Sequence, residues 1–224
     1  MSKVVARIGI SLDGYITGPD SGAEHPLGIG GERIHNWVYG LRAFREMLGQ
    51  KGGTEGQDND VVAEWVARSG AVVMGHGMFI SGEVPWGDEP PFHMPVYVVT
   101  HHPRETVVKE GGTSFHFVTE GPEHALALAR EAAGDKGVSL AGGANLIQQF
   151  IRAGLLDELL LHVVPVLTTA GTGCTAGTTP TPPSWNARSP PTPGPNSPRR
   201  VGCWSSRGTT GRRRAWRAYG SGTR

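Results

Sequence analysis

The chain has 224 residues and a formal net charge of +1. This value hides an asymmetry, because residues 1–168 carry a net charge of −8 and residues 169–224 a net charge of +9. An acidic body argues against a nucleic-acid-binding protein. Both cysteines, Cys174 and Cys203, follow the body, which excludes a disulfide framework or a cysteine-based metal site within it. No signal-peptide pattern and no apolar run of roughly 20 residues occurs, so we expect a cytoplasmic protein without membrane contact.

The first 70 residues predict one strand and two helices. Val4–Leu12 is rich in Val and Ile and predicts a strand, which a Gly- and Pro-rich loop over 17–31 follows. Apolar residues recur at helical spacing over 32–48, which predicts a helix. A second helix is expected to end at Arg68, with Asp58 or Asn59 as its N-cap.

Strands and helices then alternate to the end of the body. A long polar loop after Gly77, with several prolines, interrupts the alternation once. The alternation predicts the α/β class with a mainly parallel central sheet. The predicted strands are 71–74, 96–100, 114–118, 138–141 and a run from about 158, and the predicted helices are 119–133 and 144–153.

The most informative local pattern is a strand, two glycines and an amphipathic helix. Gly142 and Gly143 separate the apolar run 138–141 from the helix. Glycines at this point allow a ligand to approach the backbone, and the helix end offers free N–H groups to a phosphate. The pattern therefore predicts a nucleotide-cofactor site.

The segment 169–224 has a different character. It consists mainly of Gly, Thr, Pro, Ser and Arg, with no Asp or Glu and no apolar period. Such a composition predicts a disordered tail. The interpretation we favour is a reading-frame change in a GC-rich gene, and we assign the tail no function. The chain is thus divided into a domain over 1–168 and a tail over 169–224.

Three motifs then fall into order along the body: ISLDGYI over 10–16, VMG over 73–75 and AGGA over 141–144. Together they resemble the dihydrofolate reductase-like superfamily. More narrowly, they resemble the C-terminal reductase domain of the bacterial bifunctional deaminase-reductase of riboflavin biosynthesis, in its stand-alone form. The resemblance covers about residues 3–167 and implies a three-layer fold with helices on both faces of the sheet. The H-x-E and P-C-x-x-C motifs of a zinc deaminase are absent from the sequence.

The resemblance implies an NADPH-dependent reductase of 5-amino-6-(5-phosphoribosylamino)uracil that acts as a homodimer and needs no metal. Asp13 is the expected catalytic residue, although Asp13-Gly14 is also a strong turn dipeptide. The expected substrate-binding residues are Leu12, Trp37, Trp86 and His93, with core packing the alternative for Trp37 and an ordinary loop position the alternative for His93. The expected cofactor-binding residues are Gly14, Gly75, His76, Gly77, Thr100, Gly142, Gly143, Ala144 and Asn145.

Two departures from the family pattern matter. Many relatives follow Met-Gly with Arg, whereas this sequence has His76 and Gly77, and a histidine is mostly neutral near pH 7. Arg104, or His101 with His102, is the hypothetical replacement for that positive charge. The family also ends in antiparallel strands after residue 167, and we expect these strands to be missing here and the chain to be poorly stable or inactive.

Two other functions stay open at this point. Reduction of dihydrofolate or another pteridine is the first, but it calls for an acid on the helix after the first loop, where Glu32 and Glu46 are poorly placed. A non-catalytic nucleotide-binding protein is the second. Binding of NADPH without its consumption would distinguish that second class from a reductase.

Overall fold

One mainly parallel sheet organises the chain. The computed structural model describes residues 2–174, 204–207 and 213–220. The strands of this part form a single sheet in the order β4-β5-β3-β2-β6-β1-β7-β9-β8, in which only β4 and β8 run antiparallel to their neighbours. The strands are β1 (Val4–Ser11), β2 (Ser69–Gly75), β3 (Pro95–Val99), β4 (Val107–Val108), β5 (Ser114–Val118), β6 (Gly137–Gly142), β7 (Glu158–Val164), β8 (Trp204–Arg207) and β9 (Arg213–Gly220).

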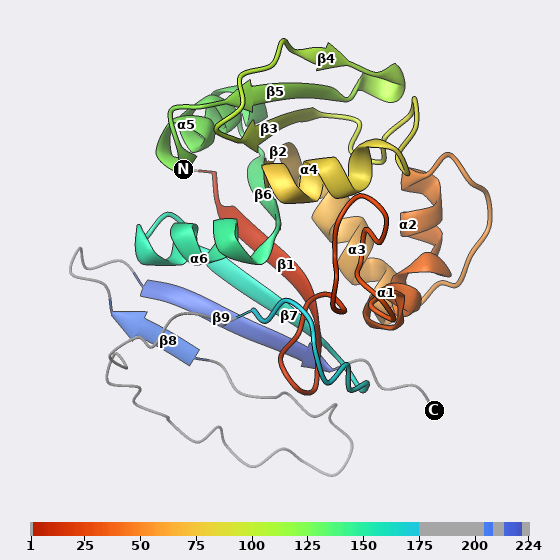
Figure 1. Cartoon of the computed structure of the whole chain (residues 1–224). Helices are drawn as coiled ribbons and strands as arrows, with labels where there is room; N and C mark the ends of the chain where they lie inside the picture. Colours follow the sequence, from red (N-terminus) through yellow and green to blue (C-terminus); the bar gives the residue numbers. More distant parts are fainter. Residues whose placement is uncertain (1, 175–203, 208–212, 221–224) are drawn as a thin grey trace.

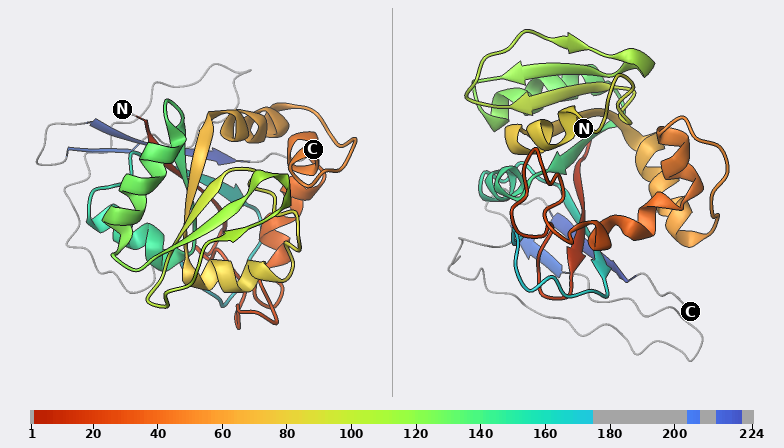
Figure 2. Two further views of the ribbon diagram at one scale, coloured as in Figure 1. Left: turned by 90° about the horizontal axis from the view of Figure 1, so that it is seen from above. Right: turned by 45° about the vertical axis from the view of Figure 1, so that its right-hand side comes forward.

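Helices cover both faces of this sheet, which confirms the predicted fold class (Figures 1 and 2). Side chains of α5 and α6 pack with Ala71, Val73 and Leu140 on the first face. Phe79 of α4 packs with Val72 and Met74 on the second face, where α1, α2 and α3 also lie. The helices are α1 (Glu32–Tyr39), α2 (Arg42–Met47), α3 (Gln57–Arg68), α4 (His76–Glu83), α5 (Pro122–Ala133) and α6 (Ala144–Arg152), with a short 3₁₀ turn over Glu110–Gly112.

The helix predicted over 32–48 is wrong in its continuity. It is two helices, α1 and α2, because Gly40 ends the first and Leu41 takes an extended conformation before the second. The apolar spacing is the same on both sides of the break, so periodicity alone could not reveal it. The sequence also gave no signal for α4, which lies in the segment expected to be a loop.

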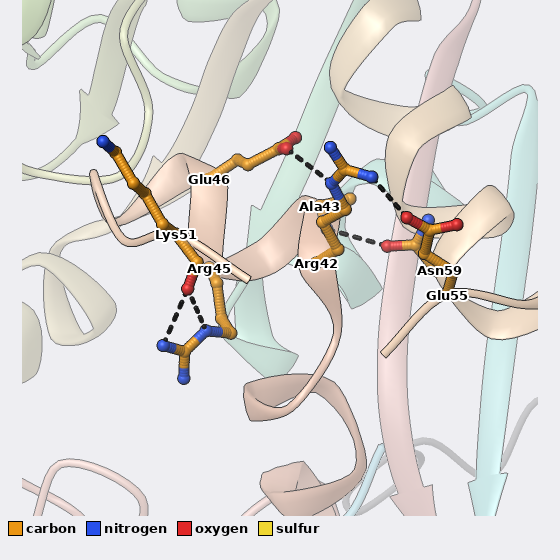
Figure 3. Close-up of polar contacts among 7 residues, drawn as sticks. All are labelled: Arg42, Ala43, Arg45, Glu46, Lys51, Glu55 and Asn59. Carbon is orange, nitrogen blue, oxygen red and sulfur yellow. Dashed lines mark hydrogen bonds and ion pairs between the residues drawn. The ribbon is translucent and has the colours of Figure 1, made fainter. Parts of the chain in front are cut away.

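Asn59 holds α2 against α3 instead of capping its own helix. The expected N-cap role is wrong, because α3 already begins at Gln57 with Gly56 as its N-cap. The side-chain oxygen of Asn59 accepts a hydrogen bond of 2.7 Å from the backbone N–H of Ala43, in the first turn of α2 (Figure 3). Arg42 forms ion pairs with Glu46 and Glu55 beside it. Asn59 therefore supplies an acceptor for a backbone N–H in the first turn of α2 that has no partner within α2.

Replacement of Asn59 tests this contact. Asn59→Ala should lower the free energy of unfolding by about 1 kcal/mol, because a partly buried N–H loses its acceptor. Asn59→Asp is the matched control, since it keeps an oxygen at the same position and should retain most of the stability. Urea unfolding of the two variants beside the parent chain measures the difference. Equal losses in both variants would contradict the capping role.

The packed structure continues past the expected boundary at residue 168. The N–H of Ile16 donates to the carbonyl of Thr172, and the N–H of Cys174 donates to the carbonyl of Gly14. Cys174 itself is buried in the core on the first face of the sheet. Residues 169–174 therefore belong to the domain. The expected disorder of 175–203, 208–212 and 221–224 lies outside the described residues.

The prediction that the C-terminal strands are missing differs from the structure. β9 pairs with β7 along Glu158–Val163, and β8 pairs with β9. The β7–β9 pairing is parallel, not antiparallel as the family resemblance implies. If β7 were at the edge of the sheet, a row of its N–H and C=O groups would have no partners. A neighbouring strand supplies those partners through backbone groups alone, whatever its side chains. Trp216 and Tyr219 were the available signal in the sequence, since aromatic residues favour strands.

Candidate active site

The carboxyl ends of β2 and β6 meet at one edge of the sheet. Val73 pairs with Leu140 but Met74 pairs with Gly142, so Ala141 is an extra residue that shifts the end of β6. A β-carbon at Gly75 would lie 3.6 Å from the N atom of Gly143 and 3.7 Å from the carbonyl O of Gly142. The predicted glycines are therefore neighbours, and Gly142, with a φ of 126°, takes a conformation that favours glycine.

Two helices begin at these glycines. α4 starts directly after Gly75 and α6 directly after Gly143, and no side chain caps the first turn of either helix. Their free N–H groups lie at the same edge of the sheet, as they do in many phosphate-binding α/β proteins. Ala144 is buried below this edge, whereas Asn145 is exposed and its side-chain oxygen accepts a hydrogen bond from Gln149.

A second group of side chains lies at the end of β3. Thr100 is buried, and its hydroxyl accepts a hydrogen bond of 3.0 Å from the N–H of His102. The imidazole of His102 contacts that of His76, with 5.1 Å between ring centroids. Arg104 lies over the rings of Phe79 and Phe117 and forms an ion pair of 2.7 Å with Glu83. The side chains of His76 and His102 are thus in contact, and Arg104 is paired with the carboxylate of Glu83.

Asp13 follows β1 and forms hydrogen bonds with the loop that follows β7. Its carboxylate accepts hydrogen bonds from the backbone N–H groups of Thr168 and Thr169, the latter at 2.7 Å. The side chain of Ser11 and then these backbone groups lower the pKa of Asp13 to about 2. At neutral pH Asp13 is therefore ionised, so it can accept hydrogen bonds but cannot act as a proton donor. Leu12, next to it, is largely exposed, and Gly14 has a φ of 90° in the same turn.

Aromatic and titratable side chains gather on the second face of the sheet, above Gly9. Because Gly9 has no side chain, Ile34 and then His35 of α1 approach the strand there. Trp37 stacks on His162 of β7, with 4.8 Å between ring centroids, and His162 is the register partner of Gly9. Burial, and then the charge of Arg7, lower the pKa of His162 to about 4. Burial also lowers the pKa of His35.

This group contains residues that the sequence analysis missed. Only Trp37 was expected there, whereas Arg7, His35 and His162 were not singled out. A signal existed, since a histidine or arginine inside an otherwise apolar strand needs a reason to be there. Which face His162 occupies could not be read without the register of β7 against β1.

Trp86 and His93 lie apart from this group. Trp86 rests on Gly82 and packs with Phe92 and Phe115, so it belongs to an aromatic cluster of the core. His93 lies before β3, at the amino end of the sheet, and its two ring nitrogens are each 2.8 Å from a carbonyl oxygen, of Gly111 and Met47. It borders a cavity of about 520 Å³ at that end. The expected substrate-binding set is therefore not one cluster.

Within the described ranges, no group of three or more His, Cys, Asp or Glu side chains is arranged to hold a metal ion. None of the helices in the same part of the chain has the length and hydropathy of a transmembrane segment.

The fold and the glycine-lined edge define a dihydrofolate reductase-like α/β protein. Comparison with known families is more specific: the RibD C-terminal domain family matches residues 2–187, so the chain belongs to that family, the reductase domains of riboflavin biosynthesis. Among solved structures, a Shewanella sp. PV-4 protein provisionally assigned to riboflavin biosynthesis superposes with a TM-score of 0.51 at 19% identity, covering 77% of this chain and 82% of that one. No curated protein sequence matches the chain.

The buried His162 makes stability depend on pH. Its pKa falls from 6.5 to about 4 on folding, so the unfolded chain takes up a proton first as the pH drops. The contribution of the neutral His162 to the free energy of unfolding is therefore fully present above pH 6.5, and it is lost as the pH falls towards 4. Since one pKa unit corresponds to about 1.4 kcal/mol, the loss amounts to at most roughly 3 kcal/mol.

Variants of His162 and Trp37 test this dependence. His162→Gln should flatten the fall of the free energy of unfolding between pH 7 and pH 4.5, measured by urea titration at each pH. Trp37→Phe keeps the histidine and should keep the slope. A slope that His162→Gln leaves unchanged would show that other groups, such as His35, cause the acid sensitivity.

Proposed function

We propose that this chain is an NADPH-dependent reductase of a phosphoribosylamino-pyrimidine, of the kind that riboflavin biosynthesis uses. The observation that carries the proposal is the meeting of Gly75 with Gly142 and Gly143 at the start of two uncapped helices. Membership in the RibD C-terminal domain family supports the same reading. Within this class of compounds, the proposed substrate is 5-amino-6-(5-phosphoribosylamino)uracil, whose ribose is reduced to a ribityl chain.

The residues at the glycine-lined edge fit a dinucleotide. A β-carbon placed at Gly143 would have no atom of the described residues within 4 Å, so the backbone there is accessible. Gly142 is buried, and a β-carbon there would lie 3.7 Å from Met78 and 4.0 Å from Ile147. The N–H groups at the starts of α4 and α6 suit a pyrophosphate, and Thr100, His76 and Gly77 suit the adenosine end. NADPH supplies the hydride when bound, so the chain has to hold it, orient the substrate and exclude water.

The substrate is proposed to lie on the second face of the sheet, beside the ring pair of Trp37 and His162. The two rings offer a flat apolar wall to a pyrimidine, whereas Ile34 of α1 fills the space at Gly9. Low pKa values keep His162 and His35 neutral near pH 7, so these side chains can donate or accept hydrogen bonds without adding charge. Asp13 keeps the loop after β1 closed against Thr168 and Thr169.

The pteridine alternative is weaker on this geometry. The face of α1 that meets the sheet carries Ile34, His35 and Trp37, and Glu32 is exposed at its N-terminus. Glu46 lies on α2, where it pairs with Arg42. No carboxylate in the described part of α1 therefore faces Gly9. The carboxylate of Asp13 is already engaged by Thr168 and Thr169, which favours the third possibility, a nucleotide-binding protein without turnover. The test below therefore includes it.

Binding and turnover are measured separately. Fluorescence titration gives the affinity for NADPH, and absorbance at the reduced nicotinamide band follows its oxidation with the phosphoribosylaminouracil, with dihydrofolate and with no substrate. The proposal expects micromolar binding and oxidation only with the uracil compound. Binding without oxidation would support the non-catalytic protein, and oxidation with dihydrofolate alone would support the pteridine reductase. Absence of NADPH binding would refute the proposal. Sedimentation of the same sample tests the proposed homodimer.

A matched pair of glycine variants tests the site of binding. Gly142→Ala should weaken NADPH binding at least tenfold, because the strained β-carbon stands at the phosphate-facing turn. Gly134→Ala is the control: Gly134 also has a positive φ, of 58°, but it ends α5 at the other edge of the sheet. Both variants should lose roughly 1–2 kcal/mol of stability. Equal affinities in the two variants would place the nucleotide elsewhere.

The low pKa of Asp13 sets a limit on its role. If Asp13 holds the loop and donates no proton, Asp13→Asn should lower kcat/KM about tenfold, because a neutral amide oxygen accepts the two N–H groups more weakly than a carboxylate does. The shape of the pH profile between 5 and 8 should stay the same, since the carboxylate does not titrate in that range. An acid or alkaline limb that disappears in Asp13→Asn would instead assign it the proton transfer.

A further inference from the structure

The segment that follows β7 runs back along the loop that follows β1 (Figure 1). The N–H of Leu12 donates to the carbonyl of Val166 at 2.9 Å, and further along the loop Tyr15 pairs with Gly173 in an antiparallel bridge. Residues 166–174 therefore form a strap beside the loop. The loop that borders the proposed substrate position has its backbone partners in this strap, and the strap in turn needs an anchor.

Cys174, the last residue of the strap, connects the loop with α6. Its N–H donates to the carbonyl of Gly14 at 3.1 Å. Its own carbonyl accepts a hydrogen bond of 3.2 Å from the side-chain amide of Gln148, which lies on α6. Cys174 is buried, so its backbone groups depend on partners within the protein. One residue thus joins the loop after β1 to the helix that begins at the glycine-lined edge.

Arg152 fixes which end of the Gln148 amide faces the strap. The guanidinium of Arg152, one turn further along α6, donates to the side-chain oxygen of Gln148 at 3.2 Å. Because a guanidinium can only donate, it has to face that oxygen, and the NH₂ group of Gln148 is then directed at the carbonyl of Cys174. A side chain with a donor and an acceptor at its end fits between these two groups.

We propose that Gln148 is a positioning residue of the reductase, which holds the strap against α6 and so sets the place of the substrate loop relative to the cofactor. This role rests on the proposed function, because it takes the start of α6 as part of the cofactor site and the loop after β1 as a wall of the substrate site. Gln148 acts through Cys174 and Gly14, not by contact with the reacting atoms.

Loss of this hydrogen bond should weaken substrate binding selectively. Without the donor of Gln148, a smaller fraction of the chain has the loop in place, and the apparent affinity for the substrate falls with that fraction. The loss of one hydrogen bond between neutral groups changes such an equilibrium about fivefold. The backbone N–H groups in the first turn of α6 keep their positions, so the affinity for NADPH should be retained.

Two variants remove the donor in different ways. Gln148→Glu keeps the size of the side chain and the contact with Arg152 but has no N–H to donate, whereas Gln148→Met removes both polar ends. Each should raise KM for the phosphoribosylaminouracil about fivefold and leave kcat and the NADPH dissociation constant nearly unchanged. Asn59→Ala is the control. It also loses a hydrogen bond between a side chain and the backbone of another element, outside the proposed sites, and it should lower stability without a change in KM.

Amide hydrogen exchange gives a second readout that needs no substrate. The N–H groups of Ile16 and Cys174 pair the loop with the strap. Their exchange should become faster in both Gln148 variants and stay unchanged in Asn59→Ala, because only the Gln148 variants release the strap from α6.

The outcomes separate this role from general stability. Unchanged exchange at Ile16 and Cys174, or faster exchange with an unchanged KM, overturns the positioning role of Gln148. An equal rise of KM in Asn59→Ala also overturns it, since any loss of stability would then act in the same way. In these cases turnover by the parent chain still supports the proposed function. A parent chain that binds no NADPH, or does not oxidise it with the uracil compound, refutes the proposed function and this role with it.

Discussion

The parallel pairing of β6 between β1 and β2 is the constraint on which the rest of the cleft depends. Three strands distant in sequence end at the same edge because their directions are fixed by this pairing. The extra residue Ala141 then moves the end of β6 so that Gly142 meets Met74 and Gly143 meets Gly75. Without that shift α4 and α6 would not begin side by side, and their free N–H groups would face different ligand atoms.

The second face of the sheet follows from the same register. Gly9 pairs with His162, so the one gap in the row of side chains on β1 lies next to the one imidazole of β7. Ile34 and His35 of α1 fill that gap, and Trp37 of the same helix stacks on His162. The two imidazoles of this surface are neutral near pH 7, because burial opposes charge on each of them, and Arg7 is the charged group beside them. A site of this kind orients an uncharged heterocycle better than it transfers protons to one.

Local patterns predicted the elements, and their limits explain what was missed. The strand ends at Gly75 and Gly142, and the helix after Gly143, follow from residue type and period. The break at Gly40-Leu41 and the short helix α4 leave no period of their own. Trp86 contacts Phe115 and His93 contacts Gly111, and both partners are distant in sequence, so these surroundings could not be predicted from local patterns. The pairing of β9 with β7 depends on backbone groups, which composition does not reveal.

Asp13 shows how the same residue serves the fold and the site. Its carboxylate satisfies two N–H groups at the point where the chain leaves β7, and residues 169–174 then return along the loop after β1. Cys174 closes this return inside the core. The loop that borders the proposed substrate position is thus held by the first residues of the basic segment. Because Asp13 is engaged there and stays ionised, the proposed reduction would take its proton from solvent or from a side chain on the second face of the sheet.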